Sequence, residues 1–186
     1  SLVRADVTSG RPGAPLEFAV QITRARDCAP LGGARLDLWQ ADALALYDWA
    51  ARRGDLDTTR ICVHGRSLGT GVAVQLAAAR PLRCLVLTSP FDSLAAVGKA
   101  HMPWLPVGLL LRHRFECLER AAALKVPALV VYGGADDIIP PAHSERLADA
   151  WGGPVERVRL DGFGHNDLDV NPRYAQAIVA FLDRHL

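Results

Sequence analysis

Short apolar segments that alternate with helix-like segments constrain the fold of this chain more than any other feature of its sequence. Strand-like segments lie at residues 61–64, 84–88, 128–132 and 155–160. Helix-like segments lie at residues 40–53, 69–79, 142–151 and 173–185. Short apolar strands separated by helices are typical of a parallel sheet covered on both faces. We therefore predict an α/β fold with a doubly wound, mostly parallel sheet.

The chain of 186 residues is long enough to bury one substantial core, so we expect residues 1–186 to form a single domain. Residues 91–125 interrupt the alternation, because they are too long for a simple connection and too apolar for a solvated loop. We expect them to form a cap or insertion over the C-terminal edge of the sheet, where substrate would bind. A pair of core helices with an awkward link is the alternative.

Charge and composition argue against several classes of protein. The formal net charge is +1 and acidic and basic residues are interspersed, so the chain lacks the basic stripe that a nucleic acid would require. The longest apolar stretches, such as residues 103–111, contain proline and are too short to cross a bilayer, and no signal peptide is visible. The four cysteines include no CxxC pair, which argues against a disulfide framework or a zinc site and favours a cytoplasmic location.

The pentapeptide Gly65-Arg66-Ser67-Leu68-Gly69 carries the clearest chemical signal. It follows an apolar strand and opens an alanine-rich helix, which is the context in which a G-x-S-x-G motif places a nucleophilic serine at a tight turn. The turn is strained and needs glycine where neighbouring backbone approaches closely. The helix N-terminus behind it favours a developing oxyanion. We therefore predict that Ser67 is a nucleophile.

A serine hydroxyl needs a neighbouring base, and His165 is the best of the six histidines. It lies in a glycine-rich loop directly after the last predicted strand, at the sheet edge where Ser67 should emerge. His143 falls in a predicted helix, so we expect it on the solvated surface. His64 precedes the elbow and is expected to pack, whereas His101 in the insertion is expected to be exposed.

The acid that orients the base should follow the third strand, where the sequence offers Asp136 and Asp137. Both carboxylates lie in a loop at the correct edge of the sheet. One of them would equally suit the first turn of the next helix, where a carboxylate complements the helix dipole. Spacing alone does not separate the two aspartates.

Together these segments resemble the small serine α/β-hydrolases. The resemblance rests on residues 65–73, on Thr88-Ser89-Pro90-Phe91, on residues 133–140 and on Gly164-His165, and it covers roughly residues 35–186. The chain is most similar to the alpha/beta hydrolase domain proteins, which are related to serine aminopeptidase-like and acyl-thioesterase-like enzymes. The family pattern G-x-x-D-x-x-[VI]-P selects Asp136 as the acid. The resemblance also implies that the backbone N–H of Leu68 forms half of the oxyanion hole.

The N-terminal segment departs from the family. Family members have several strands before the helix at residues 40–53, and a His-Gly loop supplies a second oxyanion donor, yet residues 1–35 contain no His-Gly pair. Only residues 16–23 alternate as a half-buried strand does. We therefore expect the N-terminal strands to be reduced or missing, with a sheet of about five or six strands. A sheet edge left exposed in this way would allow self-association.

The resemblance implies a serine hydrolase that cleaves carboxylic esters or thioesters through an acyl-enzyme, with no metal and no cofactor. Its substrate would be a small or lipid-like acyl compound, and the apolar residues of the insertion are predicted to line the acyl pocket: Trp104, Leu105, Leu109 and Leu110. Two alternatives remain open. One is a peptidase or amidase of the same fold, and the other is a truncated, non-catalytic scaffold that acts through a protein partner.

Overall fold

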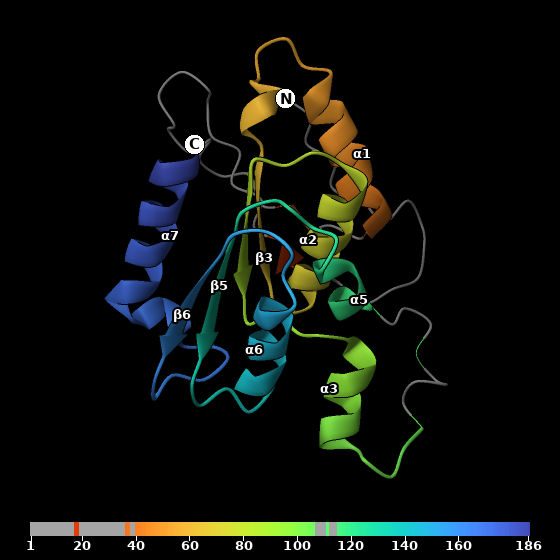
Figure 1. Cartoon of the computed structure of the whole chain (residues 1–186), viewed down its shortest axis with the longest axis vertical. Coiled ribbons are helices and arrows are strands. Elements are labelled where there is room, and N and C mark those ends of the chain that lie inside the picture. The colour runs from red at the N-terminus through yellow and green to blue at the C-terminus, as the bar shows by residue number, and fades with distance from the viewer. Residues whose placement is uncertain (1–16, 19–35, 38–39, 107–110, 112–114) are drawn as a thin grey trace.

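A computed structural model describes residues 17–18, 36–37, 40–106, 111 and 115–186 of the chain. Its centre is a four-stranded parallel sheet in the order β3-β4-β5-β6 (Figure 1). The strands are β3 (Cys62–Arg66), β4 (Cys84–Thr88), β5 (Ala128–Gly133) and β6 (Val155–Leu160). All three strand pairs are parallel, which confirms the predicted α/β class. Every residue of β4 and β5 is buried, as expected of strands covered on both faces.

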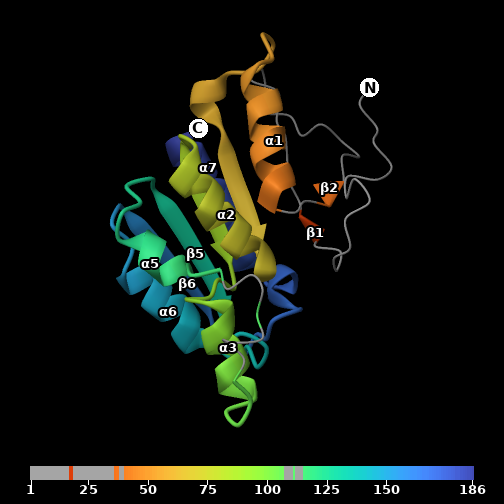
Figure 2. The same ribbon diagram turned by 90° about the vertical axis from the view of Figure 1, so that its right-hand side faces the viewer.

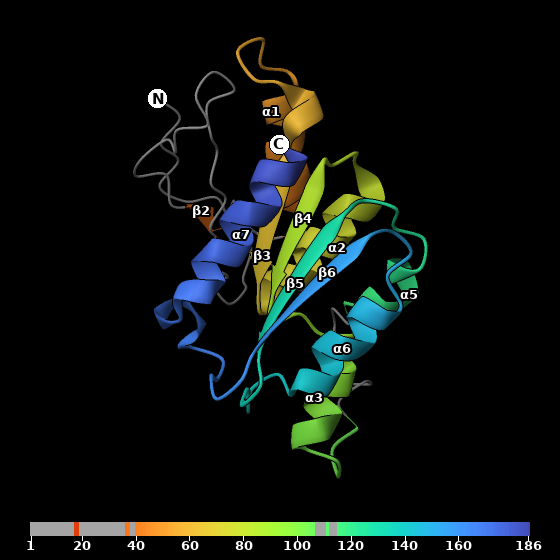
Figure 3. The same ribbon diagram turned by 60° about the vertical axis from the view of Figure 1, so that its left-hand side comes forward.

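Helices cover both faces of this sheet, as Figures 2 and 3 show. The helix α7 lies against one face, and α2, α5 and α6 lie against the other, with α1 packed on α2. The helical bounds are α1 (Gln40–Ala51), α2 (Leu68–Ala79), α3 (Leu94–His101), α5 (Cys117–Ala121), α6 (Pro141–Asp149) and α7 (Pro172–His185).

Strand alternation divides the apolar side chains between two core clusters. Leu85 and Leu87 of β4 belong to the cluster under α2, α5 and α6, whereas Cys84 and Val86 belong to the cluster under α7 with Phe181. Successive side chains of a strand point to opposite faces, so one continuous apolar run supplies both layers. This packing fixes the carboxyl ends of the strands, where the candidate site lies.

The two N-terminal strands form a separate ladder. The strand β1 (Glu17–Phe18) pairs antiparallel with β2 (Leu36–Asp37). The predicted strand at residues 16–23 is therefore represented by β1, and its other residues lie outside the described part of the chain. Because β1 and β2 pair with each other, the sheet among the described residues has four strands rather than the expected five or six.

The predicted insertion at residues 91–125 divides into two parts with different surroundings. The helix α3 contains no buried residue and lies beyond the carboxyl ends of the strands (Figures 1 and 2). The short helix α5, by contrast, buries Cys117 and Ala121 in the main core. The core-helix alternative therefore fits α5, whereas the cap over the substrate site stays a prediction for α3.

Candidate active site

Ser67 stands at the turn between β3 and α2 in a conformation that non-glycine residues rarely adopt. Its φ is 53° and its ψ is −126°. The Ser67 amide donates to the Thr88 carbonyl over 2.8 Å, and the Thr70 amide donates to the Ser67 carbonyl over 2.9 Å. The Thr70 hydroxyl also donates to the Ser67 carbonyl, at 2.7 Å. These bonds hold the strained turn in place from both sides.

Glycine at position 65 permits this turn. A Cβ atom added to Gly65 would lie 2.6 Å from the Gly69 carbonyl oxygen, which is closer than real Cβ contacts allow. The spacing in G-x-S-x-G therefore has a steric cause, because the backbone near the end of β3 contacts the backbone of the first turn of α2. The serine between them is left clear of the backbone.

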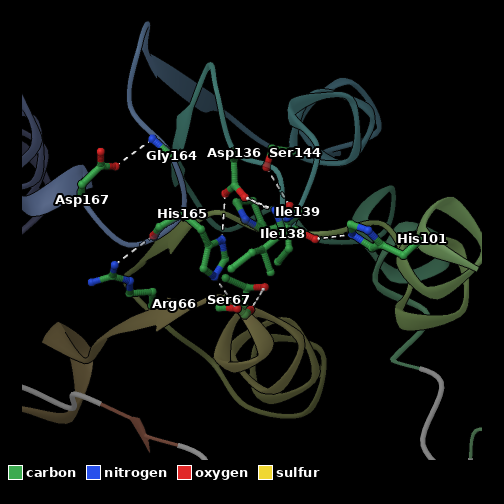
Figure 4. A network of polar contacts seen from close by, with 12 residues as sticks. Arg66, Ser67, His101, Asp136, Ile138, Ile139, Ser144, Gly164, His165 and Asp167 are labelled. Carbon is green, nitrogen blue, oxygen red and sulfur yellow. Dashed lines mark hydrogen bonds and ion pairs between the residues drawn. The ribbon is translucent and has the colours of Figure 1, made fainter.

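A relay of hydrogen bonds joins three of the residues identified from the sequence (Figure 4). His165 Nε2 lies 2.9 Å from Ser67 Oγ, and His165 Nδ1 lies 2.8 Å from Asp136 Oδ2. The His165 ring is 7% exposed and the Asp136 side chain is fully buried. The three residues follow β3, β5 and β6, so the parallel sheet brings them together at one edge although 98 residues separate Ser67 from His165.

The two candidate acids have different surroundings. Asp136 Oδ2 faces His165, and Asp136 Oδ1 accepts the amides of Ile138 and Ile139 at 3.0 and 2.8 Å. Burial would raise the pKa of the Asp136 carboxyl, but the hydrogen bonds from His165 and the Ile139 amide bring that pKa below its ordinary value. Asp137 is exposed. In the structure, Asp136 and not Asp137 contacts His165 Nδ1.

Arg66 is a site residue that sequence reasoning missed. Its guanidinium donates to the His165 carbonyl over 3.0 Å, so the residue before Ser67 holds the loop that carries the histidine. A second contact steadies that loop, since the Gly164 amide donates to Asp167 Oδ1 over 2.7 Å. In the sequence, Arg66 occupies the first variable position of G-x-S-x-G, and nothing there indicates a partner for it.

Behind the elbow, a polar cluster joins β3, β4 and α7. His64 Nε2 lies 2.9 Å from Thr88 Oγ1, which in turn lies 3.1 Å from the Tyr174 hydroxyl. Burial, and after it the charge of Arg66, lowers the pKa of His64 to about 4. His64 is therefore a neutral packing residue near pH 7, on the same side of β3 as Arg66.

His143 is not on the surface, and that expectation is wrong. It is 4% exposed, and its Nδ1 lies 2.7 Å from Oδ1 of the buried Asp92. Arg146 Nε donates to the other Asp92 oxygen over 2.8 Å, and the Ser144 hydroxyl donates to the Pro90 carbonyl over 2.7 Å. The polar first turns of α6 face inward because they bind the loop after β4.

The remaining predicted site residues are distributed as follows. Leu68 is the first residue of α2, where a backbone N–H has no acceptor within the helix, and its role as an oxyanion donor stays a prediction. Trp104 is 78% exposed, and with Leu105 it borders a hollow of about 490 Å³ beside α3. Leu109 and Leu110 lie outside the described residues. The acyl-pocket role of these four residues stays a prediction.

Neither a metal centre nor a membrane-crossing helix is found in the described part of the chain. Among those residues no three His, Cys, Asp or Glu side chains gather as ligands of a metal ion would. None of the helices described is both long enough and apolar enough to traverse a bilayer.

Three features together define the α/β-hydrolase class. They are a parallel sheet with helices on both faces, a strained serine at a strand-to-helix turn, and a Ser–His–Asp relay at the carboxyl edge of the sheet. Among known proteins similar to this chain, several are named as alpha/beta hydrolase domain-containing proteins. An uncharacterised protein of Mycobacterium tuberculosis H37Rv is 49% identical over 130 residues, covering 70% of this chain and 46% of that protein. The alpha/beta hydrolase domain-containing protein aho-3 of Caenorhabditis elegans is 28% identical over 145 residues, covering 77% of this chain and 42% of that protein. No protein-family model matches the chain.

Solved structures show the same fold. The acetyl xylan esterase from Paenibacillus sp. R4 matches with a TM-score of 0.67 at 20% identity, covering 79% of this chain and 52% of the esterase. The acylaminoacyl peptidase of Pyrococcus horikoshii matches with a TM-score of 0.64 at 15% identity, covering 79% of this chain and 28% of the peptidase. The chain has an α/β-hydrolase fold and is similar to proteins named as alpha/beta hydrolase domain-containing, and it spans about half the length of the curated relatives it matches.

Proposed function

We propose that this chain carries the catalytic centre of a serine hydrolase that cleaves carboxylic esters or thioesters through an acyl-enzyme. The observation that carries the proposal is the relay from Asp136 through His165 to Ser67, with contacts of 2.8 and 2.9 Å. An esterase among the proteins of like fold supports the choice of substrate class. The free thiols of Cys62, Cys84 and Cys117 support a cytoplasmic location.

Each residue of the relay has a defined role in this proposal. His165 Nε2 takes the proton of Ser67 Oγ as the oxygen attacks the substrate carbonyl, and later returns a proton to the leaving group. The Asp136 carboxylate holds the Nδ1–H tautomer and stabilises the imidazolium that forms. The Leu68 amide, at the N-terminus of α2, donates to the oxyanion of the tetrahedral intermediate. Water then repeats the attack on the acyl-enzyme and releases the acid.

A fluorophosphonate probe tests the proposal directly, because it labels only a serine that a base has activated. We expect the wild-type chain to be labelled and Ser67→Ala to remain unlabelled. Ser93→Ala is the matched control, because it removes a hydroxyl that caps α3 by accepting the Ala96 amide and leaves the elbow intact. Mass spectrometry should place the adduct on Ser67. An unlabelled wild-type chain that is folded by circular dichroism would favour the non-catalytic scaffold.

Peptidase or amidase activity is the second candidate, favoured by the acylaminoacyl peptidase of like fold. The two candidates differ in the leaving group rather than in the relay, because an amine must be protonated to leave whereas an activated phenol or thiol need not be. Paired p-nitrophenyl ester and p-nitroanilide substrates with the same acyl group separate them. We expect Ser67-dependent turnover of the ester and none of the anilide above the Ser67→Ala background, whereas Ser67-dependent cleavage of the anilide would establish the second candidate.

A further inference from the structure

The end of α3 and the turn that follows it expose large apolar side chains beside a cation. We call this surface the cap tip, and it consists of Lys99, Met102, Pro103, Trp104, Leu105 and Pro106. Trp104 is 78% exposed and Met102 is 40% exposed, and Trp104 is the most exposed large apolar residue of the described chain. Tryptophan is usually well buried, so a nearly bare indole marks a surface that contacts something else.

The cap tip lies at the same end of the strands as the candidate active site. The helix α3 extends past the carboxyl ends of the strands (Figures 1 and 2). His101, in the last turn of α3, places Nε2 2.8 Å from the Ile138 carbonyl oxygen (Figure 4). The amide of the same Ile138 donates to Asp136. One residue thus joins the end of α3 to the loop that carries the proposed acid.

Along the chain, the segment that carries the cap tip contains basic residues and no acidic ones. Lys99 and His101 are the basic residues in the last turn of α3, and both are exposed. The sequence from residue 93 to residue 115 contains no Asp or Glu, although the whole chain has 20 acidic residues against 21 Lys and Arg. An exposed indole beside a lysine, on a segment without carboxylates, suits the interface of an anionic bilayer, where tryptophan lies at headgroup depth and lysine binds lipid phosphate.

We infer that the cap tip docks on an anionic lipid surface and so presents the candidate active site to acyl substrates held in the membrane. The docking depends on the cap tip alone, whereas the delivery of substrate to Ser67 rests on the proposed function. Proline at positions 103 and 106 favours this role, because a restrained backbone loses little freedom when the indole between them inserts. The hollow of about 490 Å³ that Lys99 and Trp104 border gives the surface a recess beside the charge.

Vesicle co-sedimentation tests the docking with the whole chain. We expect binding to phosphatidylcholine vesicles that contain phosphatidylglycerol and little binding to phosphatidylcholine alone. Trp104→Ala should weaken binding about tenfold or more, because an inserted indole supplies most of the apolar contact. Lys99→Gln should weaken it about fivefold, since each cation near the surface contributes about 1 kcal/mol. Val179→Ala is the control, because Val179 is 56% exposed on α7.

Fluorescence gives a second measurement that does not depend on the stability of an alanine variant. Addition of anionic vesicles should shift the tryptophan emission of the wild type to shorter wavelength, and Trp104→Phe should abolish most of that shift. Equal binding to neutral and anionic vesicles, or unchanged binding by Trp104→Ala, would overturn the inference. So would a concentration-dependent dimer that Trp104→Ala dissociates in the absence of vesicle binding, because a second copy would then be the occupant.

Ser67→Ala separates this inference from the proposed function. The variant should bind anionic vesicles as the wild type does, because Ser67 lies outside the cap tip. Vesicle binding without fluorophosphonate labelling would uphold the docking and refute the hydrolase. Labelling without vesicle binding would uphold the hydrolase and refute the docking.

Discussion

Replacing Asp136 by asparagine should disable the relay through a defined change of tautomer. Asp136 Oδ1 accepts two amides, from Ile138 and Ile139, so the amide oxygen of an asparagine must take the same place. Its NH₂ group then faces His165 Nδ1, and the ring must carry its proton on Nε2 to avoid two opposed donors. An Nε2–H imidazole cannot accept the proton of Ser67. The base is present in Asp136→Asn but in the wrong form.

The size of the loss follows from the cost of turning the asparagine around. The reversed side chain restores the productive tautomer but leaves two buried amides without an acceptor, at about 1–3 kcal/mol each. A total of about 2–6 kcal/mol lowers the reactive fraction between about 30-fold and about 10⁴-fold. The same substitution in the serine-protease triad lowers kcat by about 10⁴. We therefore expect a loss near the upper end of this range.

Initial rates with p-nitrophenyl acetate, or the rate of fluorophosphonate labelling, measure the loss. Asp137→Asn is the matched control and should retain nearly full rate, because Asp137 is exposed and not on the histidine. Thermal denaturation should show both variants folded. If Asp136→Asn kept more than a tenth of the wild-type kcat/KM, or if Asp137→Asn lost more, the assignment of the acid and the tautomer argument would both be refuted.

Three further predictions concern the surroundings of the relay. Arg66→Ala should lower kcat about tenfold with little change in KM, because it releases the His165 carbonyl. Arg66→Lys should restore part of the rate. Equal loss in both variants would contradict a tethering role. Gly65→Ala should reduce the free energy of unfolding by about 1–3 kcal/mol in urea titrations, because the added Cβ meets a carbonyl oxygen at 2.6 Å. Gly54→Ala is the control and should leave the free energy of unfolding unchanged, because a Cβ at that position meets open space. The pKa of His64, lowered by burial to about 4, means that the unfolded chain binds a proton there below pH 6.5 and the folded chain does not. Stability should therefore fall by about 3 kcal/mol between pH 6.5 and pH 4, and His64→Gln should remove this part of the pH dependence; an unchanged pH profile would show that His64 titrates normally.

The strands were predictable because a strand buried on both faces is a short, continuous run of apolar residues in the sequence. The prediction for β4 was residues 84–88 and for β6 residues 155–160, and the structure has both bounds unchanged. The strand β3 was predicted at residues 61–64 and runs from Cys62 to Arg66. The difference arises because the parallel ladder with β4 continues through Gly65 and Arg66, up to the turn itself. An apolar pattern cannot report the pairing of residues that are glycine or charged.

His143 shows where residue type misled the prediction although the pattern held the answer. A histidine within a polar helix predicts a solvated residue. His143, however, lies one turn before Leu147, which is fully buried, so both belong to the inner face of α6. What the sequence could not supply was the partner, because Asp92 is 51 residues away and reaches the helix only through the fold. The same limit applies to Arg66 and the His165 carbonyl, which are 99 residues apart.

The backbone at Ser67 bears on whether the relay is used or merely retained. A non-glycine residue at φ 53° carries strain on the order of 1–3 kcal/mol, which a glycine at the same place would avoid. A scaffold that acted only through a partner would gain stability from that glycine and would lose nothing. A serine at this position offsets the cost of its strained backbone only if its hydroxyl, held 2.9 Å from His165 Nε2, takes part in a reaction. The strain at the elbow therefore supports the hydrolase proposal over the scaffold. It also implies that Ser67→Gly should unfold at a higher temperature than the wild type while losing all fluorophosphonate labelling.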